Sequence, residues 1–173
     1  MRAVLSVGSN MDDRWALLRT VAEDFAAEIV AESPVYATPP WGVTDQDEFL
    51  NAVLVVEVAG TPLELLRRGQ RLEDAAERVR VRRWGPRTLD VDVVQVLADG
   101  AEILSDDPEL TLPHPHAHER AFVLVPWLAA DPQARLRGRR VAALVEKLAA
   151  AEVEQVRPVG TLAGGPDSGA DTR

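Results

Sequence analysis

Apolar runs and the alternation of apolar and polar residues predict four strands along this chain. Residues 2–7 and 30–37 are short apolar runs, and residues 49–58 alternate between two faces. One of these faces carries Leu50, Ala52, Leu54, Val56 and Val58, and the other carries Phe49, Asn51, Val53, Val55 and Glu57. Successive side chains of a strand point to opposite sides of a sheet, so this pattern predicts a strand over 49–58. Residues 89–97 are apolar on both faces beyond Asp92, which predicts a central strand.

Between and after these strands, apolar residues recur three and four positions apart, which predicts helices. The predicted helices cover residues 15–29, 62–77, 120–130 and 141–148. The second of them opens with Thr61-Pro62-Leu63-Glu64, a capping box with proline at the first helical position.

The mixed order of strands and helices predicts the α+β class, with one largely antiparallel sheet and helices packed against it. The 173 residues suffice for one domain with a buried core. We expect this domain to span residues 1–157. From residue 158 onward Gly, Pro, Asp, Ser and Thr dominate, so residues 158–173 are expected to form a disordered tail.

Composition narrows the class of protein. The sequence has no cysteine, which excludes disulfides and thiolate metal sites, and no apolar run approaches the ~20 residues of a membrane-spanning helix. We therefore expect a cytoplasmic protein without a membrane partner. The net charge of −9 argues against general binding of nucleic acid, which depends on Lys and Arg contacts to phosphates.

Positive charge nevertheless gathers in one segment. Residues 67–87 contain eight arginines and three acids, a local charge of +5 in a chain of net charge −9. Lys147 is the only lysine, so any phosphate bound at this arginine-rich segment would be held by guanidinium groups. Such a segment suits a compact polyanion, and a merely solvated charged surface is the alternative. Trp84-Gly85-Pro86 argues against that alternative, because a tryptophan in a polar loop is either anchored in the core or presented to a planar ligand.

Asp90 and Asp92 begin the strand that follows the arginine-rich segment. Residues i and i+2 of a strand point to the same side, roughly 6–7 Å apart. Two such carboxylates repel each other unless a cation lies between them, and Mg²⁺ usually binds one or two carboxylates together with substrate phosphates. An acidic strand start near solvent is the alternative. The apolar strand and the neighbouring arginines favour a metal, and with it phosphoryl-type transfer from a nucleoside triphosphate.

Phe49 and Asn51 share one face of the predicted 49–58 strand. They either belong to a second core covered by helices, or they present an aromatic plate and an amide that reads the edge of a heterocycle. Asn has both a donor and an acceptor, so it can pair with an aminopyrimidinone edge. Phe122 is the candidate for a second aromatic plate.

Three histidines, His114, His116 and His118, alternate along an extended segment. This spacing is compatible with a zinc site, but the prolines between the histidines weaken that geometry. The interpretation we favour is one histidine that donates to a phosphate, with Arg120 just downstream.

These motifs together resemble the 6-hydroxymethyl-7,8-dihydropterin pyrophosphokinase family over about residues 2–150. The most specific mark is Arg83-Trp84-Gly85-Pro86-Arg87-Thr88-Leu89-Asp90-Val91-Asp92, which is similar to the family signature R-W-G-P-R-x-L-D-[LIV]-D. The supporting marks are Gly8-Ser9-Asn10, Thr38-Pro39-Pro40, Phe49-Leu50-Asn51-Ala52, Gln70-Arg71-Leu72-Glu73, Pro113-His114 and Arg120-Ala121-Phe122.

The resemblance implies a ferredoxin-like α+β core, ATP as co-substrate and two Mg²⁺ ions. It implies transfer of pyrophosphate from ATP to the hydroxymethyl oxygen of 6-hydroxymethyl-7,8-dihydropterin, with release of AMP. We expect a monomer whose partners are these two small molecules.

By position, the resemblance assigns the metal ions to Asp90 and Asp92. It assigns the pterin to Thr38, Pro39, Trp41, Phe49, Asn51 and Phe122. It assigns ATP to Gln70, Glu73, Arg78, Arg80, Trp84, Arg87, His114 and Arg120. The implied catalytic residues are Arg80, Arg87, Asp90 and Asp92, and Arg78 and Arg80 belong to a loop that closes over the site.

Other classes of protein explain fewer of these residues. A different metal-dependent nucleotidyl or phosphoryl transferase needs two aspartates but gives no reason for Phe49, Asn51 and Phe122. A nucleic-acid or regulatory module would use the arginines, yet the acidic total disfavours it. A catalytically dead homologue acting as a partner subunit is disfavoured by the intact aspartate pair.

Overall fold

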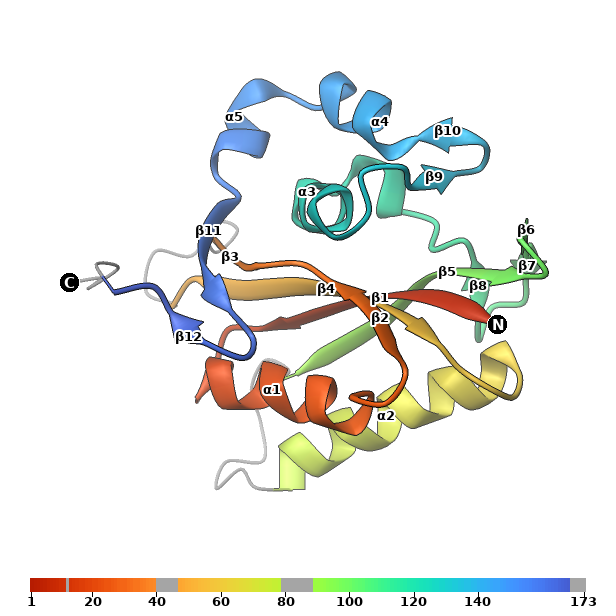
Figure 1. The fold of residues 1–173 in the computed structure, drawn as a ribbon, viewed down its shortest axis with the longest axis horizontal. Helices are drawn as coiled ribbons and strands as arrows, with labels where there is room; N and C mark the ends of the chain where they lie inside the picture. The colour runs from red at the N-terminus through yellow and green to blue at the C-terminus, as the bar shows by residue number, and fades with distance from the viewer. Residues whose placement is uncertain (12, 40–46, 79–88, 169–173) are drawn as a thin grey trace.

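A sheet between two layers of helices forms the body of the protein (Figure 1). The structure, a computed structural model, describes residues 1–11, 13–39, 47–78 and 89–168, apart from the side chain of Arg78. Within these residues the main sheet has eight strands, in the order β12-β11-β3-β4-β1-β5-β6, with β2 also paired to β4. The predicted α+β class is confirmed.

Four strands make up most of this sheet: β1 (Arg2–Ser9), β3 (Val35–Thr38), β4 (Phe49–Glu57) and β5 (Asp90–Ala98). β1 lies between β4 and β5, β3 lies on the outer side of β4, and each of these pairs is antiparallel. With one helix after β1 and another after β4, this is the predicted ferredoxin-like arrangement. Because β1 is antiparallel to both neighbours, its last residues lie beside the first residues of β4 and β5.

Helices α1 (Arg14–Asp24) and α2 (Pro62–Arg78) cover the face of the sheet that is lower in Figure 1. Thr61 and Glu64 exchange hydrogen bonds at the start of α2, as the predicted capping box requires. One face of β4 packs here, and its residues Leu50, Ala52, Leu54 and Val56, with Val58 just after the strand, belong to the larger core.

Helices α3 (Ala121–Ala130) and α4 (Val141–Lys147) cover the opposite face, and α5 (Ala150–Glu154) follows α4. Val53 and Val55 of β4 pack here against Trp127 in a second core. The second face of β4 is therefore core along its middle, while Phe49 and Asn51 lie at its beginning.

Short elements complete the chain. β6 (Ala101–Glu102) pairs with the end of β5, and β7 (Ser105–Asp106) pairs with β8 (Thr111–Leu112). The 3-10 turn η1 (Ala117–Glu119) precedes α3, and β9 (Arg135–Leu136) and β10 (Arg139–Arg140) form a hairpin before α4.

Two strand predictions need correction. Residues 30–37 form two strands, β2 (Ile29–Glu32) and β3, because Pro34 interrupts the run and the hydroxyl of Ser33 accepts the N–H of Val53 at 2.9 Å. β5 is central only at its far end, since β6 pairs with Leu97 and Ala98 alone.

The expected disordered tail is also wrong for the residues that the structure describes. Residues Arg157–Thr161 form β11, which pairs with the outer edge of β3, and Gly165–Pro166 form β12, which pairs with β11. The buried side chains of Val156 and Leu162 fix this segment, although its composition is rich in Gly and Pro. Residues 169–173 lie outside the described residues.

Candidate active site

The register of the three central strands brings the predicted pterin and metal residues to one place. Gly8 of β1 pairs with Asn51 of β4 on one side and with Asp90 of β5 on the other. Neighbouring strands lie ~4.8 Å apart, so the backbones of Asn51 and Asp90 are about 10 Å apart across Gly8. The next row places Ser6 between Val53 and Asp92 in the same way.

Gly8 lets the Asn51 side chain lie over β1. A Cβ atom added at Gly8 would lie 2.8 Å from Oδ1 of Asn51, closer than real Cβ contacts. Asn51 is buried, and its Nδ2 donates to Oγ1 of Thr38 at 3.0 Å. Thr38 in turn pairs with Phe49 across β3 and β4. The structure thus brings together Thr38, Phe49 and Asn51, with the exposed Pro39 directly after them.

Asp90 and Asp92 are both partly buried and lie on the same side of β5 as Val94, which packs in the α3 core. Both carboxylates are therefore directed to the face of the sheet that carries Asn51. Among the described residues, no group of three or more His, Cys, Asp or Glu is placed to hold a metal ion by itself. Two oxygen donors from neighbouring alternate positions still fit Mg²⁺, which takes its remaining ligands from phosphates and water.

His114 borders the aspartates from the segment that precedes α3. Its backbone N–H donates to the carbonyl of Val94 at 2.8 Å, which holds the residue along the outer edge of β5. Its Nδ1 accepts the N–H of His116 at 3.2 Å, so the neutral ring carries its proton on Nε2. Burial lowers the pKa of His114; the Asp92 carboxylate opposes this shift, and Arg120 and His116 reinforce it. The ring is therefore a neutral donor near neutral pH.

Arg120 and Phe122 lie at the start of α3, where Arg120 is the residue before the helix. The Arg120 guanidinium carbon lies 5.6 Å from the centre of the Phe122 ring. Both side chains are partly buried. Arginine thus places a permanent positive charge beside an aromatic plate and within electrostatic reach of His114.

Helix α2 carries two predicted ATP residues, and it lies on the face opposite α3. Gln70 accepts a hydrogen bond from the Arg67 guanidinium at 2.8 Å. Glu73 accepts the backbone N–H of Val91, between the two aspartates, at 2.8 Å. Their contact with ATP stays a prediction.

The structure does not describe the side chains of several predicted site residues. Trp41, Arg80, Trp84 and Arg87 lie outside the described residues, as does the side chain of Arg78, which ends α2. Their assigned roles stay predictions.

Two neighbours of the site were missed by the sequence analysis. Ser6 lies beside Asp92, and Tyr36 of β3 pairs with Asn51 and packs with Ala121 at the start of α3. Burial raises the pKa of Tyr36. The alternation of strand residues identifies their faces, but only the register shows which residues they border.

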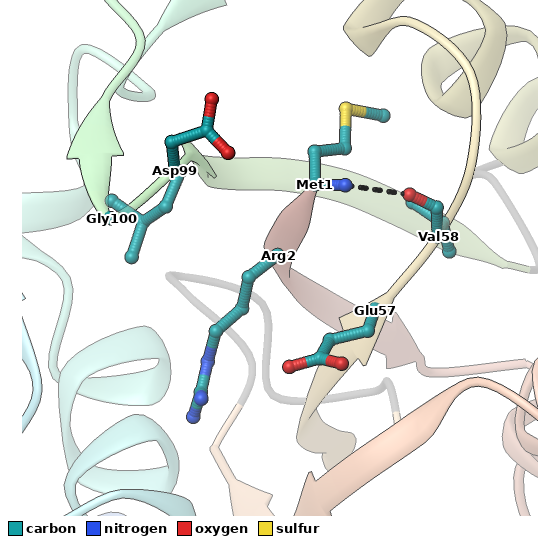
Figure 2. Close-up of a pocket in the computed structure, with 7 residues that line it drawn as sticks. Met1, Arg2, Glu57, Val58, Asp99 and Gly100 are labelled. Carbon is teal, nitrogen blue, oxygen red and sulfur yellow. Dashed lines mark hydrogen bonds between the residues drawn. The ribbon is translucent and has the colours of Figure 1, made fainter.

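A separate pocket of about 460 Å³ lies at the opposite end of β1 (Figure 2). It is lined by Met1, Arg2, Glu57, Val58, Leu97, Asp99 and Gly100. The terminal ammonium of Met1 donates to the carbonyl of Val58 at 2.8 Å there. None of the predicted site residues lines this pocket.

None of the helices in the described ranges has the length and apolar character that a membrane crossing requires.

Residues 4–132 match the sequence model of the family described as 7,8-dihydro-6-hydroxymethylpterin-pyrophosphokinase (HPPK). A relative from Mycobacterium tuberculosis strain H37Rv, named 2-amino-4-hydroxy-6-hydroxymethyldihydropteridine pyrophosphokinase, is 48% identical over 166 residues, 90% of this chain and 88% of the relative. A relative of the same name from Methylorubrum extorquens is 43% identical over 159 residues, which cover 90% of this chain and 98% of that relative.

Solved structures share the fold. The crystal structure of Plasmodium falciparum HPPK-DHPS wild type matches with a TM-score of 0.59 and 15% identity, over 84% of this chain and 44% of that chain. A structure of HPPK-DHPS in complex with substrates matches with a TM-score of 0.61 and 12% identity, over 84% of this chain and 42% of the other. This chain thus spans less than half the length of those proteins, and at these identities the likeness concerns the fold alone.

Proposed function

The chain belongs to the 7,8-dihydro-6-hydroxymethylpterin-pyrophosphokinase family, and from that membership we propose which of its residues carry the reaction. The chain is an ATP-dependent diphosphotransferase of folate biosynthesis. It transfers pyrophosphate from ATP to the hydroxymethyl group of 6-hydroxymethyl-7,8-dihydropterin and releases AMP. We assign this transfer to the face of β4, β1 and β5 that meets the start of α3.

One observation carries the assignment: Asn51, Gly8 and Asp90 form a single row across three adjacent strands. The row places the backbone of Asn51, whose amide can read an aminopyrimidinone edge, about 10 Å from the backbone of Asp90, and both side chains are directed to the same face. A bicyclic pterin bound at Asn51 can span that distance and direct its hydroxymethyl group toward Asp90 and Asp92.

The two aspartates are proposed to hold Mg²⁺, and two ions suit two carboxylates spaced along one strand. When bound, Mg²⁺ offsets phosphate charge and aligns the triphosphate with the attacking oxygen. The chain itself contributes fixed carboxylates, the neutral Nε2–H of His114 as a donor to a phosphate oxygen, and the Arg120 charge. Such prearranged donors and charges are the main means by which proteins promote phosphoryl transfer.

The pterin is proposed to stack between Phe49 and Phe122, which come from the start of β4 and the start of α3. Thr38 supports the amide of Asn51 through the 3.0 Å hydrogen bond, and Pro39 closes the same side. The Arg120 guanidinium near Phe122 fixes the second plate. Trp41 is proposed to complete the pterin side, and Gln70, Arg78, Arg80, Trp84 and Arg87 to complete the ATP side.

The test is AMP formation from ATP, Mg²⁺ and 6-hydroxymethyl-7,8-dihydropterin, measured for the wild-type chain and two matched variants. Asp92→Asn removes a carboxylate of the pair at constant size and is expected to lower turnover more than about 100-fold, since even indirect support of a metal ligand is worth 10–100-fold. Asp106→Asn removes an exposed carboxylate on β7 and should leave turnover unchanged. Full activity of Asp92→Asn in magnesium buffer refutes the site assignment.

A further inference from the structure

The edge of β5 beside the two aspartates is closed by a helix side chain. Glu73 of α2 accepts the backbone N–H of Val91 at 2.8 Å, in a partly buried position. Val91 is the residue between Asp90 and Asp92. The carboxylate of Glu73 therefore contacts the backbone of the Asp-Val-Asp segment from the α2 side of the sheet, opposite the face to which the two aspartate carboxylates are directed.

The hydrogen bond from Val91 to Glu73 satisfies a backbone N–H at a part of the β5 edge that has no neighbouring strand among the described residues. β1 pairs with β5 on one side, and β6 reaches only Leu97 and Ala98 on the other. Backbone groups of successive strand residues point to alternate sides, so the Val91 N–H is directed to the outer edge and the N–H groups of Asp90 and Asp92 to β1. Within the part of the chain that the structure describes, no strand pairs with this edge at Val91.

Further along the same edge, backbone groups take over. The N–H of His114 donates to the carbonyl of Val94, and the N–H of Ile103 donates to the carbonyl of Val96, each at 2.8 Å. At Val91, between the two aspartates, the side chain of Glu73 thus takes the place that backbone groups take at Val94 and Val96.

Close packing brings α2 to this position. A Cβ atom added at Gly69, one helical turn before Glu73, would lie 3.2 Å from a methyl carbon of Val91. Val91 itself is buried. The helix therefore approaches β5 closely enough for a carboxylate to reach the strand edge, and the Val91 side chain and N–H are both held by α2.

We propose that Glu73 is a positioning residue, which fixes the Asp90-Val91-Asp92 backbone so that both carboxylates keep the spacing a metal requires. The inference rests on the proposed function, because it presumes that these aspartates hold Mg²⁺. It differs from the predicted role of Glu73 as a contact of ATP. A carboxylate beside a triphosphate would meet like charge, whereas a carboxylate on an N–H forms a charge-assisted hydrogen bond.

Three variants test the proposal. Glu73→Ala removes the acceptor, Glu73→Gln keeps an oxygen that can accept the Val91 N–H, and Glu77→Ala removes an exposed carboxylate one turn further along α2. For Glu73→Ala we expect about a 10-fold lower kcat and about a 10-fold higher Mg²⁺ concentration for half-maximal activity, with an unchanged KM for the pterin. Glu73→Gln should recover most of both values, and Glu77→Ala should match the wild type.

A second measurement is independent of activity. Amide hydrogen exchange at Val91, followed by NMR in the metal-free protein, should be faster in Glu73→Ala than in the other three proteins. Unchanged exchange overturns the proposal. So does an equal loss in Glu73→Gln and Glu73→Ala with a raised KM for ATP, which would mean that the carboxylate acts by charge or by contact with the nucleotide.

The two proposals fail differently. An active Asp92→Asn variant removes the metal assignment, and the inference on Glu73 falls with it. A normal Mg²⁺ dependence of Glu73→Ala, in a protein whose Asp92→Asn variant is inactive, overturns only the positioning role.

Discussion

Replacing Gly8 by alanine should damage recognition of the pterin while leaving ATP in place. The added Cβ would lie 2.8 Å from Oδ1 of Asn51, whereas its other near neighbour, the Leu50 carbonyl oxygen, lies at an ordinary 3.7 Å. Asn51 is buried and bonded to Thr38, so its amide can escape the contact only by moving or rotating. Gly8 has extended backbone in the middle of a sheet, so backbone strain does not complicate the substitution.

The size of the effect follows from the groups that must move. Relief of the contact breaks the Asn51–Thr38 hydrogen bond, which lowers the stability of the fold by about 1 kcal/mol in the free and the bound protein alike. It also displaces the amide from the pterin edge, and a lost hydrogen bond to a substrate costs a similar amount. Since 1.4 kcal/mol corresponds to a factor of ten, the loss of the bond to the substrate should lower kcat/KM for the pterin by about 5- to 10-fold. The KM for ATP should stay within about twofold, because Asp90 lies on the other side of β1.

The assay is steady-state AMP formation with each substrate varied in turn, supported by direct titration of the pterin. Asn51→Ala and the double variant Gly8→Ala/Asn51→Ala complete a thermodynamic cycle. If the Cβ acts through Asn51, Gly8→Ala has almost no further effect once the amide is gone. Fully additive losses, or an equal rise in the KM for ATP, would show that the row across β4, β1 and β5 does not work as described.

Two predictions concern stability. Thr61→Ala breaks the capping box of α2 and should lower the free energy of unfolding, measured by urea titration, by about 1 kcal/mol. AMP formation should stay unchanged. An unaltered midpoint of the urea titration would mean that the cap contributes nothing to stability. The second prediction uses the lowered pKa of His114. The unfolded chain binds the imidazole proton at a higher pH than the folded protein does. The stability that the neutral His114 ring contributes is therefore complete above the unfolded pKa of ~6.5, and it is lost as the pH falls from there through the lower pKa of the folded protein. Between pH 7.5 and 5.5 the wild type should therefore lose more stability than His114→Asn, and parallel losses would contradict the assignment.

Local patterns were sufficient for the elements that frame the site. The alternation over 49–58 identified the two faces of β4, and Thr61-Pro62-Leu63-Glu64 identified the start of α2, because both signals depend on residues within one element. The Asp-Val-Asp spacing likewise predicted two carboxylates on one face of β5. Hydrogen bonds from one element to another, such as Glu73 to Val91, have no such local signal.

The tail shows where composition misleads. Residues 158–168 contain the glycines and prolines of a disordered segment, yet β3 leaves an open edge that β11 occupies. An added strand needs backbone groups more than it needs a characteristic composition, and two buried side chains, Val156 and Leu162, suffice to hold it. Arg157 then reaches Glu48, the residue before Phe49, at 2.7 Å. The end of the chain thus supports the start of the strand that carries Phe49 and Asn51, the residues proposed to bind the pterin.

The strand of the aspartates shows why a strict two-residue period also has limits. Counted from Asp90, such a period would place Val96 on the α3 face, but Val96 lies in the core beneath α1 and α2. The register shifts at this point, since Val4 pairs with Gln95 and Leu5 with Val93, which leaves Val94 without a partner on β1. The extra residue puts both Val94 and Gln95 on the α3 side, where Gln95 donates to the carbonyl of Arg135 at 2.7 Å. Residues 93–97 are apolar apart from Gln95, so the sequence gives no sign of the bulge. The aspartates keep their predicted face because they lie before it, on the part of β5 that pairs with β1 in regular register.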